Sequence, residues 1–529
     1  MKYNNPVISG FHPDPSVCRV GDDYYLVTSS FDYFPGVPIF HSKDLVNWTQ
    51  LGHVLTRENQ LPLKRPFPMP LSFGIFAPTI RYNEGRFYVI TTNLSLRGKN
   101  FYVWAEQPEG PWSDPIYIEG WGGIDPSLHF DQDGKVYLTG NAGGNGEEDG
   151  IYQAELEIAT GRLLSERRLI WRGTGGSHPE APHLYHMDGW YYLLIAEGGT
   201  EYGHMVTIAR SRHPYGPYES NSSNPILSNR STGKGIQATG HADLVQAADG
   251  SWWAVFLGVR PITHSKRHHL GRETNLSAVS WTENGWPIIG EAGQAEIEND
   301  AGTLPLGVPE LWEPKDDFNS DTLSPVWNFY RNPQPGSWSL TEKPGWLTLN
   351  GQSSNLDDGE SPAFVGRRQQ HFNCEVSSLL EFIPVDDGDE AGLTVYMNEN
   401  YHYEIARTCK QGQSVVIFRR RIGSLWKVEA EVPYSESTVV FHISATEQHY
   451  KFSYATSSGE VIEIGTGETG MLATEVAGGY TGIFIAMYAT GNGKDARTSA
   501  RFDYFEYCPG EEKEPMDFAA MIIASLKNK

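Results

Sequence analysis

The sequence predicts an all-β protein in which a five-bladed β-propeller, residues 1–305, is followed by an antiparallel β-sandwich, residues 316–529. With 529 residues, the chain exceeds the ~250–300 residues at which a single core stops growing. Its 56 glycines, 33 prolines, 15 tryptophans and 27 tyrosines indicate aromatic-rich strands joined by many turns. A five-fold repeat and a later change to strict alternation indicate which β-architecture each half adopts.

One segment pattern occurs five times in the propeller region. Each copy has a short start, a glycine turn and a strand whose aromatic lies 11 or 12 residues after the start. The copies start at Asp14, Ala77, Asp125, Ala181 and His241. Their turn glycines are Gly21, Gly85, Gly134, Gly189 and Gly250, and their aromatics are Tyr25, Tyr88, Tyr137, Tyr192 and Trp253. Such a repeat is typical of propeller blades, whereas unrelated sandwich hairpins would not keep turn and aromatic in step.

The propeller geometry brings the starts of these copies together. The innermost strand of each blade runs along the central channel, so equivalent strand starts converge on one axis. We therefore expect a single funnel lined by Asp14, Ala77, Asp125, His241 and Glu180, the last preceding Ala181. More than 200 residues separate the first of them from the last.

The second half consists of short alternating segments such as WLTLNG, GLTVYM and GIFIAMYA. Period-2 alternation with turn residues between segments predicts an antiparallel sandwich. The Gly-, Pro- and acid-rich stretch before residue 316 is expected to connect the two domains, with a final propeller strand in part of it as the alternative. The last segment, residues 514–529, has helical character and is expected to be either a short docking helix or a frayed terminus.

Charge and composition exclude several classes of partner. The 41 basic and 65 acidic residues give a net charge of −24, which opposes binding to nucleic acid. No apolar run reaches the ~18 residues of a membrane span, and the first residues lack the apolar core of a secretory signal, so we expect a cytoplasmic protein. The scattered Cys18, Cys374, Cys409 and Cys508 are expected to be free thiols, with one disulfide as the alternative. Assembly into a homo-oligomer is left open.

Three carboxylates of the predicted funnel suggest a chemistry. Asp14 and Asp125 both lie in D-P-S, and Glu180 lies in S-H-P-E-A-P. Hydrolysis of a glycosidic bond needs one carboxylic acid to protonate the leaving oxygen and a second carboxylate to activate water or attack carbon. An isolated Asp before Pro is usually a turn residue. Its occurrence at equivalent starts of the repeat favours a functional role instead.

These residues lie in motifs that resemble glycoside hydrolase family 43, specifically its two-domain β-xylosidase/α-L-arabinofuranosidase branch. The motifs include SFGIFAPTIRY, GGIDPSLHFDQDGKVYLTG, SHPEAPHLY, GHADLVQAADGSWWAVFLG and LGRET. The resemblance implies a five-bladed propeller with a jelly-roll, concanavalin-like sandwich, and an inverting mechanism. It implies that Asp14 is the general base, Glu180 the general acid, and Asp125 the modulator of the acid's pKa. Inversion requires the two reacting carboxyls to lie ~6.5–9.5 Å apart.

The resemblance also suggests supporting residues. Arg272 in GRET would contact the terminal sugar near the base, with a surface ion pair as the alternative. From their positions beside the inner-strand segments, Phe31 and Phe76 are expected to wall a sugar face, with a place in the core as the alternative. Phe484 in TGIFIAM is expected to close the pocket from the sandwich. His241 would lie in the central channel, where it holds either a calcium ion or only water. No organic cofactor is expected.

The expected function is exo-acting hydrolysis that releases xylose, and also arabinose, from the non-reducing ends of xylo- and arabinoxylo-oligosaccharides, as in xylan degradation. Two alternatives fit a propeller. A retaining glycosidase of the invertase type would carry its acids in different motifs, N-D-P-x-G, R-D-P and E-C-P. A non-catalytic carbohydrate-binding propeller would not need three funnel carboxylates together with GRET.

Overall fold

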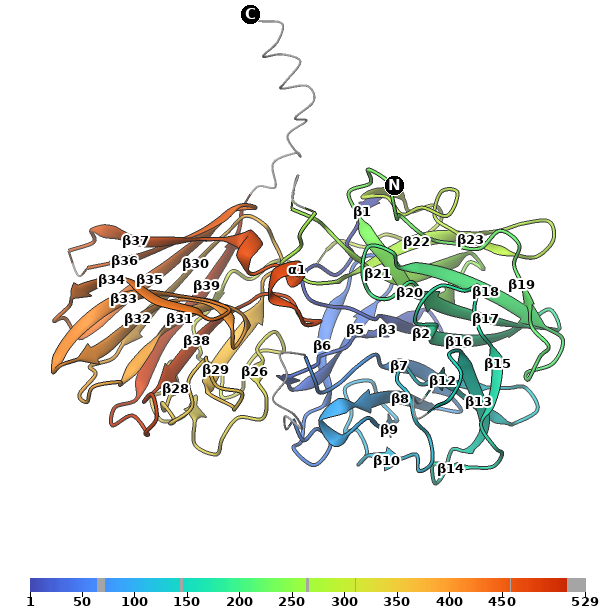
Figure 1. The fold of residues 1–529 in the computed structure, drawn as a ribbon, viewed down its shortest axis with the longest axis horizontal. Helices are drawn as coiled ribbons and strands as arrows, with labels where there is room; N and C mark the ends of the chain where they lie inside the picture. Colours follow the sequence, from blue (N-terminus) through green and yellow to red (C-terminus); the bar gives the residue numbers. More distant parts are fainter. Residues whose placement is uncertain (64–71, 143–145, 263–265, 310, 457, 511–529) are drawn as a thin grey trace, which may run out of the picture.

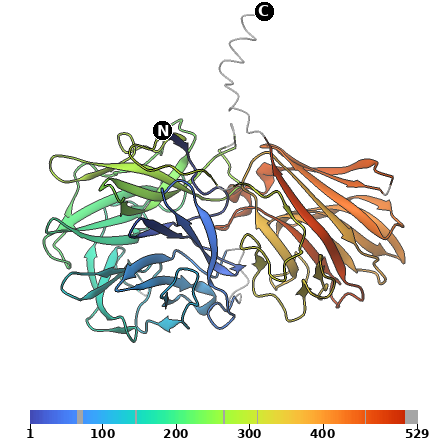
Figure 2. The same cartoon turned by 180° about the vertical axis from the view of Figure 1, so that it is seen from behind.

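The computed structural model describes residues 1–63, 72–142, 146–262, 266–309, 311–456 and 458–510. Two β-rich domains lie side by side, with the blue-to-green propeller and the orange-to-red sandwich in contact along one face (Figure 1). The view from behind shows the same division (Figure 2). The 514–529 segment lies outside the described residues. None of the described helices is long and apolar enough to cross a membrane.

Five separate sheets form the blades, each with its strands in chain order from the axis outwards. Blade 1 contains β2 (Ser16–Val20), β3 (Asp23–Val27), β5 (Gly36–Ser42) and β6 (Thr49–Leu55). Blade 2 contains β7 (Thr79–Asn83), β8 (Arg86–Asn93), β9 (Lys99–Ala105) and β10 (Ile116–Tyr117). Blade 3 contains β11 (Ser127–Phe130), β12 (Val136–Asn141), β13 (Ile151–Glu157), β14 (Arg162–Leu163) and β15 (Arg168–Trp171), of which β14 and β15 both pair with β13.

The last two blades have the same layout. Blade 4 contains β16 (Glu180–Met187), β17 (Trp190–Glu197), β18 (Met205–Ser211) and β19 (Glu219–Ser220). Blade 5 contains β20 (Gln237–Gln246), β21 (Trp252–Val259), β22 (Glu273–Trp281) and β23 (Pro287–Ile289). The predicted five-bladed propeller is therefore confirmed.

The ring closes through its inner strands. Strand β2 contacts β7 on one side and β20 on the other, and β11 and β16 complete the circle. At the end of the propeller, β1 (Lys2–Asn4) pairs antiparallel with β24 (Glu298–Asp300). The five turn glycines of the repeat have φ between 63° and 87°, a conformation that glycine adopts without steric cost.

Each of the five blade interfaces has its own apolar cluster. The repeat aromatics pack in these clusters: Tyr88 lies between blades 2 and 3, Tyr137 between blades 3 and 4, and Trp253 between blades 5 and 1. The aromatics therefore recur because every interface must be filled. This packing holds the strand starts at fixed positions around the axis.

Two antiparallel sheets form the sandwich. The larger one contains β27 (Trp338–Ser339), β28 (Leu347–Leu349), β39 (Ala500–Pro509), β30 (Cys374–Glu381), β35 (Thr438–Ala445), β36 (His449–Ala455) and β37 (Val461–Glu468), with β25 (Lys315–Asp316) paired to β39. The smaller one contains β29 (Ala363–Arg368), β38 (Phe484–Thr490), β31 (Glu390–Asn398), β32 (Tyr401–Lys410), β33 (Gln413–Ile422) and β34 (Leu425–Pro433). The predicted sandwich is confirmed, and all four cysteines are free.

The two domains share backbone pairing and an apolar interface. Strand β4 (Tyr33–Phe34) of the propeller pairs with β26 (Phe329–Tyr330), which precedes the sandwich strands. One apolar cluster joins Phe11 and Phe31 of the propeller to Tyr396 of the sandwich. Short helical turns, η2 (Thr469–Met471) and α1 (Thr474–Ala477), lie in the chain before β38. This docking brings the segment before β38 to the mouth of the propeller.

Candidate active site

The backbone is in the left-handed region where four of the five repeats enter the funnel. Asp14 and Asp125 both have φ of 54°, Ala181 has φ of 53° and His241 has φ of 50°. Non-glycine residues rarely adopt this conformation, and it clusters at functional sites when the surrounding fold enforces it. The repeat therefore imposes one backbone shape that presents side chains to the funnel.

A pocket of about 510 Å³ occupies the funnel. It contains every predicted site residue except Phe484: Asp14, Phe31, Phe76, Asp125, Glu180, His241 and Arg272. Further residues complete its wall: Ala77, Ile124, Asn141, Ser177, His178, Gly198, Gly199, Thr200, Glu201, His204 and Tyr480. The structure thus brings together the three carboxylates that the sequence separates widely.

Asp14 is held as an anion. One guanidinium nitrogen of Arg272 donates to Asp14 Oδ1 at 2.7 Å, and the Ser29 hydroxyl donates to Oδ2. Burial alone would raise the pKa of Asp14, but Arg272, His241 and Ser29 outweigh it and lower the pKa below its ordinary value. A carboxylate that stays ionised and accepts protons is suited to act as a base.

The other two carboxyls are shifted the opposite way. Burial, followed by the charge of Asp14, raises the pKa of Glu180 to about 7. Burial, followed by the charges of Glu180 and Asp14, raises the pKa of Asp125 well above its ordinary value. One carboxyl with a lowered pKa therefore lies beside two carboxyls whose pKa values are raised. Environments that push the pKa values of neighbouring acids apart are typical of paired acid and base catalysts.

Arg272 links the base to the sandwich. Besides binding Asp14, its guanidinium donates to the Thr200 hydroxyl at 3.1 Å and to the Tyr480 carbonyl oxygen at 3.2 Å. It lies 5.5 Å from the ring centroid of Phe31. The surface ion pair considered as an alternative does not apply, because Arg272 is only 7 % exposed.

Three aromatic rings form one wall of the pocket. Phe31 lies 4.8 Å from Phe76 and 5.7 Å from Tyr480, measured between ring centroids. Phe76 and Tyr480 lie 5.8 Å apart, edge to face. Aromatic faces of this kind pack well against the C–H faces of a sugar ring.

The expectation that Phe484 closes the pocket is wrong. Phe484 is fully buried and stacks on Tyr33 at 3.7 Å between ring centroids, inside the domain interface. Four residues earlier in the chain, Tyr480 provides the contact from the sandwich. Strand β38 begins at Phe484, so its side chain belongs to the sheet, whereas Tyr480 lies in the preceding loop and is free to reach the pocket.

His241 lies beside Asp14, with 3.7 Å between Nδ1 and Oδ1. Burial, and then Arg272, lowers its pKa despite the opposing charge of Asp14. Asp14 is already engaged by a guanidinium, and among the described residues no group of three His, Cys, Asp or Glu side chains is arranged to hold a metal ion. A cation beside His241 would therefore take most of its ligands from water.

A buried polar network closes the funnel below the carboxylates, with a contribution from every blade. Asp243 accepts from Ser16 Oγ at 2.6 Å, from Arg81 at 2.8 Å and from the Tyr185 hydroxyl at 2.6 Å. Arg81 also contacts His183 Nδ1 at 2.9 Å, and Ser127 lies 3.3 Å from the same atom. These residues follow the pocket residues at the five strand starts by two to five positions, counted from Asp14, Ala77, Asp125, Glu180 and His241. The network fixes the positions of the inner strands along the propeller axis relative to one another.

Sequence reasoning missed Tyr480, Thr200, His204 and Asp243. Asp243 lies in GHAD, two residues after His241, as Ser16 and Ser127 lie two residues after Asp14 and Asp125. This offset is visible in the repeat, so these members of the network could have been predicted from the sequence. Tyr480 and Thr200 lie in loops, where no period marks them.

Comparison with known proteins supports the same assignment. The model of glycosyl hydrolases family 43 matches residues 3–287, and that of the β-xylosidase C-terminal concanavalin A-like domain matches residues 315–508. A non-reducing end α-L-arabinofuranosidase of Bacteroides ovatus is 44% identical over 96% of this chain and 94% of its own. A xylosidase/arabinosidase of Butyrivibrio fibrisolvens is 37% identical over 95% of this chain and 98% of its own.

Solved structures agree. The Bacteroides ovatus xyloglucan PUL GH43B structure superposes with a TM-score of 0.91 at 43% identity, covering 96% of this chain and 100% of its own. A xylan β-1,4-xylosidase from Bacillus halodurans gives a TM-score of 0.89 at 35% identity, with the same coverage. Family enzymes need no organic cofactor. The chain belongs to glycosyl hydrolases family 43 and is a glycoside hydrolase.

Proposed function

We propose that this enzyme removes single xylose and arabinofuranose residues from the non-reducing ends of xylo- and arabinoxylo-oligosaccharides, with inversion of configuration. The names of the relatives support both sugars, because they include an α-L-arabinofuranosidase and enzymes described as xylosidase/arabinosidase. The observation that carries the proposal is the opposite shift of two pKa values in one pocket. The pKa of Asp14 is lowered, while that of Glu180 is raised to about 7.

The catalytic step follows from these protonation states. Asp14 accepts a proton from water, whose oxygen bonds to the anomeric carbon from the face opposite the leaving group. The bond between that carbon and the glycosidic oxygen breaks, and Glu180 donates its proton to the departing oxygen. Asp125 accepts hydrogen bonds from sugar hydroxyls, and its charge influences the pKa of Glu180. Arg272 keeps the base and the terminal sugar in the relative positions that the reaction needs.

The shape of the pocket supports exo action. The network around Asp243 closes it from below, and Tyr480 covers one side from the sandwich. A polymer cannot pass through a pocket closed at its inner end, so the enzyme binds only a chain terminus. The expected product is monosaccharide from the first turnover onward.

Two measurements test this function. Purified protein is incubated with xylobiose, arabinoxylo-oligosaccharides and polymeric xylan, and early products are separated by chromatography. Monosaccharide as the sole early product supports the proposal, while mixed oligomers with rapid loss of viscosity contradict it. Proton NMR of the first-formed sugar tests inversion, because a retained anomeric configuration would exclude the single-step mechanism.

We retain calcium as a separate proposal, with no catalytic step assigned to it. His241 could supply one nitrogen to a cation that is otherwise bound by water, and the cation's charge would then act on the nearby carboxylates. EDTA is expected to lower the melting temperature, and His241→Ala to remove that response. An unchanged melting temperature and activity after thorough chelation would exclude the metal.

We also propose that the enzyme acts in the cytoplasm on imported oligosaccharides. The free state of all four cysteines supports a reducing compartment. Activity assays of separated cells and medium test this, and activity found chiefly in the medium without lysis would contradict it. Homo-oligomerisation stays a prediction, which sedimentation of the purified protein would decide.

A further inference from the structure

A second hollow lies directly beside the pocket. Its volume is about 500 Å³, close to the about 510 Å³ of the pocket, and Ile124 and Asn141 line both. It runs across blades 2 and 3, between the turn η1 (Leu94–Leu96) with the start of β9 on one side and the 117–124 loop on the other. We call it the blade 2/3 groove.

We propose that the blade 2/3 groove binds the leaving-group chain of the substrate, an uncharged oligosaccharide of two or more sugars beyond the cleaved bond. This inference rests on the proposed function, in which only the terminal sugar enters the pocket. The remainder of the chain must then leave the pocket over its rim, and the groove begins at that rim.

Strand directions place the groove on the same end of the propeller as the pocket. The inner strands β7 and β11 begin just after the pocket residues Ala77 and Asp125. Strands β8 and β12 are antiparallel to β7 and β11, so their last residues lie at this same end of the propeller. Asn141 is the last residue of β12. The groove and the pocket therefore open toward the same solvent-facing side.

The wall between the two hollows is backbone-rich and firmly held. A Cβ on Gly123, whose φ is 86°, would lie 2.4 Å from the Asn141 carbonyl oxygen. The Ile124 N–H donates to Asn141 Oδ1 at 2.7 Å, and Arg167 donates to the Asn141 carbonyl oxygen at 3.2 Å. The adjacent Gly122 and Gly123 leave room for a ligand at this wall, and the contacts to Asn141 keep its shape when one binds.

The lining suits a chain rich in hydroxyl groups. The Tyr117 ring is partly buried, with the Lys99 ammonium 5.4 Å from its centroid, and Lys99 lies 3.9 Å from Glu119. Arg97 is exposed and forms no ion pair within the described part of the chain. Where the groove meets the pocket, the side-chain oxygen of Asn141 accepts the hydrogen bond from Ile124. The Nδ2 group of Asn141 donates to no other described residue. Donors, an acceptor and an aromatic face together match a neutral sugar chain.

The test is a double variant, Arg97→Ala with Lys99→Ala, that removes two exposed cations from the groove. Its matched control is Arg86→Ala with Lys135→Ala, which removes the same two charges from exposed hairpin turns at the opposite end of blades 2 and 3. For each protein, kcat/KM is measured with a 4-nitrophenyl glycoside and with xylo-oligosaccharides of two to six sugars.

We expect kcat/KM of the wild type to rise with chain length, and the groove variant to lose most of that rise, by about fivefold or more for the longest substrates. The aryl glycoside should be hydrolysed within twofold of wild type by both variants. Equal losses on aryl and long substrates, or a groove variant that matches its control at every length, would overturn the inference. A wild type that hydrolyses no aryl xyloside or arabinofuranoside would instead reject the proposed function.

Discussion

Glu180 in the propeller and Glu404 in the sandwich each lie close to a second carboxyl, yet their surroundings shift their pKa values in opposite directions. Burial and the charge of Asp14 raise the pKa of Glu180 to about 7. Burial would also raise that of Glu404, but Arg419 and His402 outweigh it and lower the pKa to about 2. The difference lies in how many cations each cluster contains.

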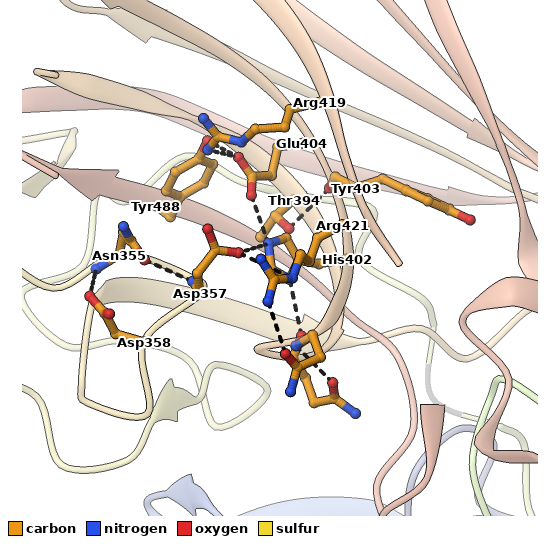
Figure 3. A network of polar contacts seen from close by, with 12 residues as sticks. Asn355, Asp357, Asp358, Thr394, His402, Tyr403, Glu404, Arg419, Arg421 and Tyr488 are labelled. Atoms are coloured by element: carbon orange, nitrogen blue, oxygen red, sulfur yellow. Dashed lines mark hydrogen bonds and ion pairs between the residues drawn. The ribbon is translucent and has the colours of Figure 1, made fainter. Parts of the chain in front are cut away.

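In the sandwich cluster, Glu404 lies between Arg419 and His402, with Tyr488 close by (Figure 3). Arg419 binds both Glu404 and Glu390, His402 Nε2 lies 2.8 Å from Glu404, and the Tyr488 hydroxyl donates to both carboxylates. Despite burial, hydrogen bonds to Asp357 and Glu404 raise the pKa of His402 to about 9. Its stabilising contribution is therefore complete below pH 6.5 and is lost as pH rises through about 9, whereas that of Glu404 is complete above pH 4.5 and lost as pH falls through about 2.

Four carboxyls line the pocket, Asp14, Asp125, Glu180 and Glu201, whereas Arg272 is the one arginine among its described lining residues and is committed to Asp14. The pKa values of Glu180 and Asp125 are raised instead, which costs stability once the pH favours ionisation of these groups in the unfolded chain. A buried acid kept short of cations inside an open pocket is characteristic of a catalytic site, while a fully paired one is characteristic of a structural core. Five predictions test this contrast.

The largest effect is expected from Asp14→Ala. Removing the base should reduce kcat by about 10²–10⁴-fold or more on both activated and natural substrates, because water must still be activated in each case. Azide, a nucleophile that needs no deprotonation, should restore part of the turnover. A variant with near-normal kcat would show that Asp14 is not the base.

In the sandwich, Glu404→Gln should lower stability by about 3–5 kcal/mol, because it leaves Arg419 and His402 short of a buried anion. Its kcat at low temperature should equal that of wild type, since the cluster does not line the pocket. Chemical denaturation measures the first quantity and an aryl glycoside assay the second. The control is Glu429→Gln, which changes an exposed glutamate paired with Arg420 and should alter neither stability nor kcat. A Glu404→Gln variant as stable as wild type would refute the structural role of Glu404.

In the funnel, Glu180→Gln should change stability in the opposite direction, so that the variant is more stable than wild type. The carboxyl is shifted from 4.5 to about 7, and each pKa unit corresponds to about 1.4 kcal/mol. The gain should reach about 1–3 kcal/mol at pH 8 and fall to about 0.4 kcal/mol at pH 4.5, where the acid is protonated in the folded state and half protonated in the unfolded state. Denaturation at these two pH values measures it. Destabilisation at pH 8 would place Glu180 among paired, structural carboxylates.

A smaller effect concerns the pH dependence of the reaction. Above about pH 7, kcat/KM of the wild type should fall as Glu180 loses its proton. Asp125→Asn removes a neighbouring carboxyl whose charge interacts with Glu180, so this alkaline limb should move to lower pH by up to about one unit. An unmoved limb in a variant that remains active would show that Asp125 acts only on the sugar.

Much of this account was predictable from the sequence because the propeller repeats itself. Equivalent strand starts identified Asp14, Asp125 and Glu180, and the structure brings all three into one pocket. Phe484 could not be distinguished from Tyr480, because alternation in a strand does not reveal where the strand begins. The sandwich network was missed for a related reason: its members alternate along β31, β32, β33 and β38 like ordinary strand residues, and only three-dimensional pairing shows that they meet.

The assignment of Glu180 as the acid is tested most directly by varying the leaving group. Glu180→Ala is assayed with a dinitrophenyl glycoside, whose leaving group needs no proton, and with xylobiose or an arabinose-substituted oligosaccharide, whose leaving group does. We predict a loss of less than about tenfold on the activated substrate and of about 10²–10⁴-fold on the natural one. Equal losses on the two substrates would contradict the assignment, and with it the contrast between the funnel and the sandwich.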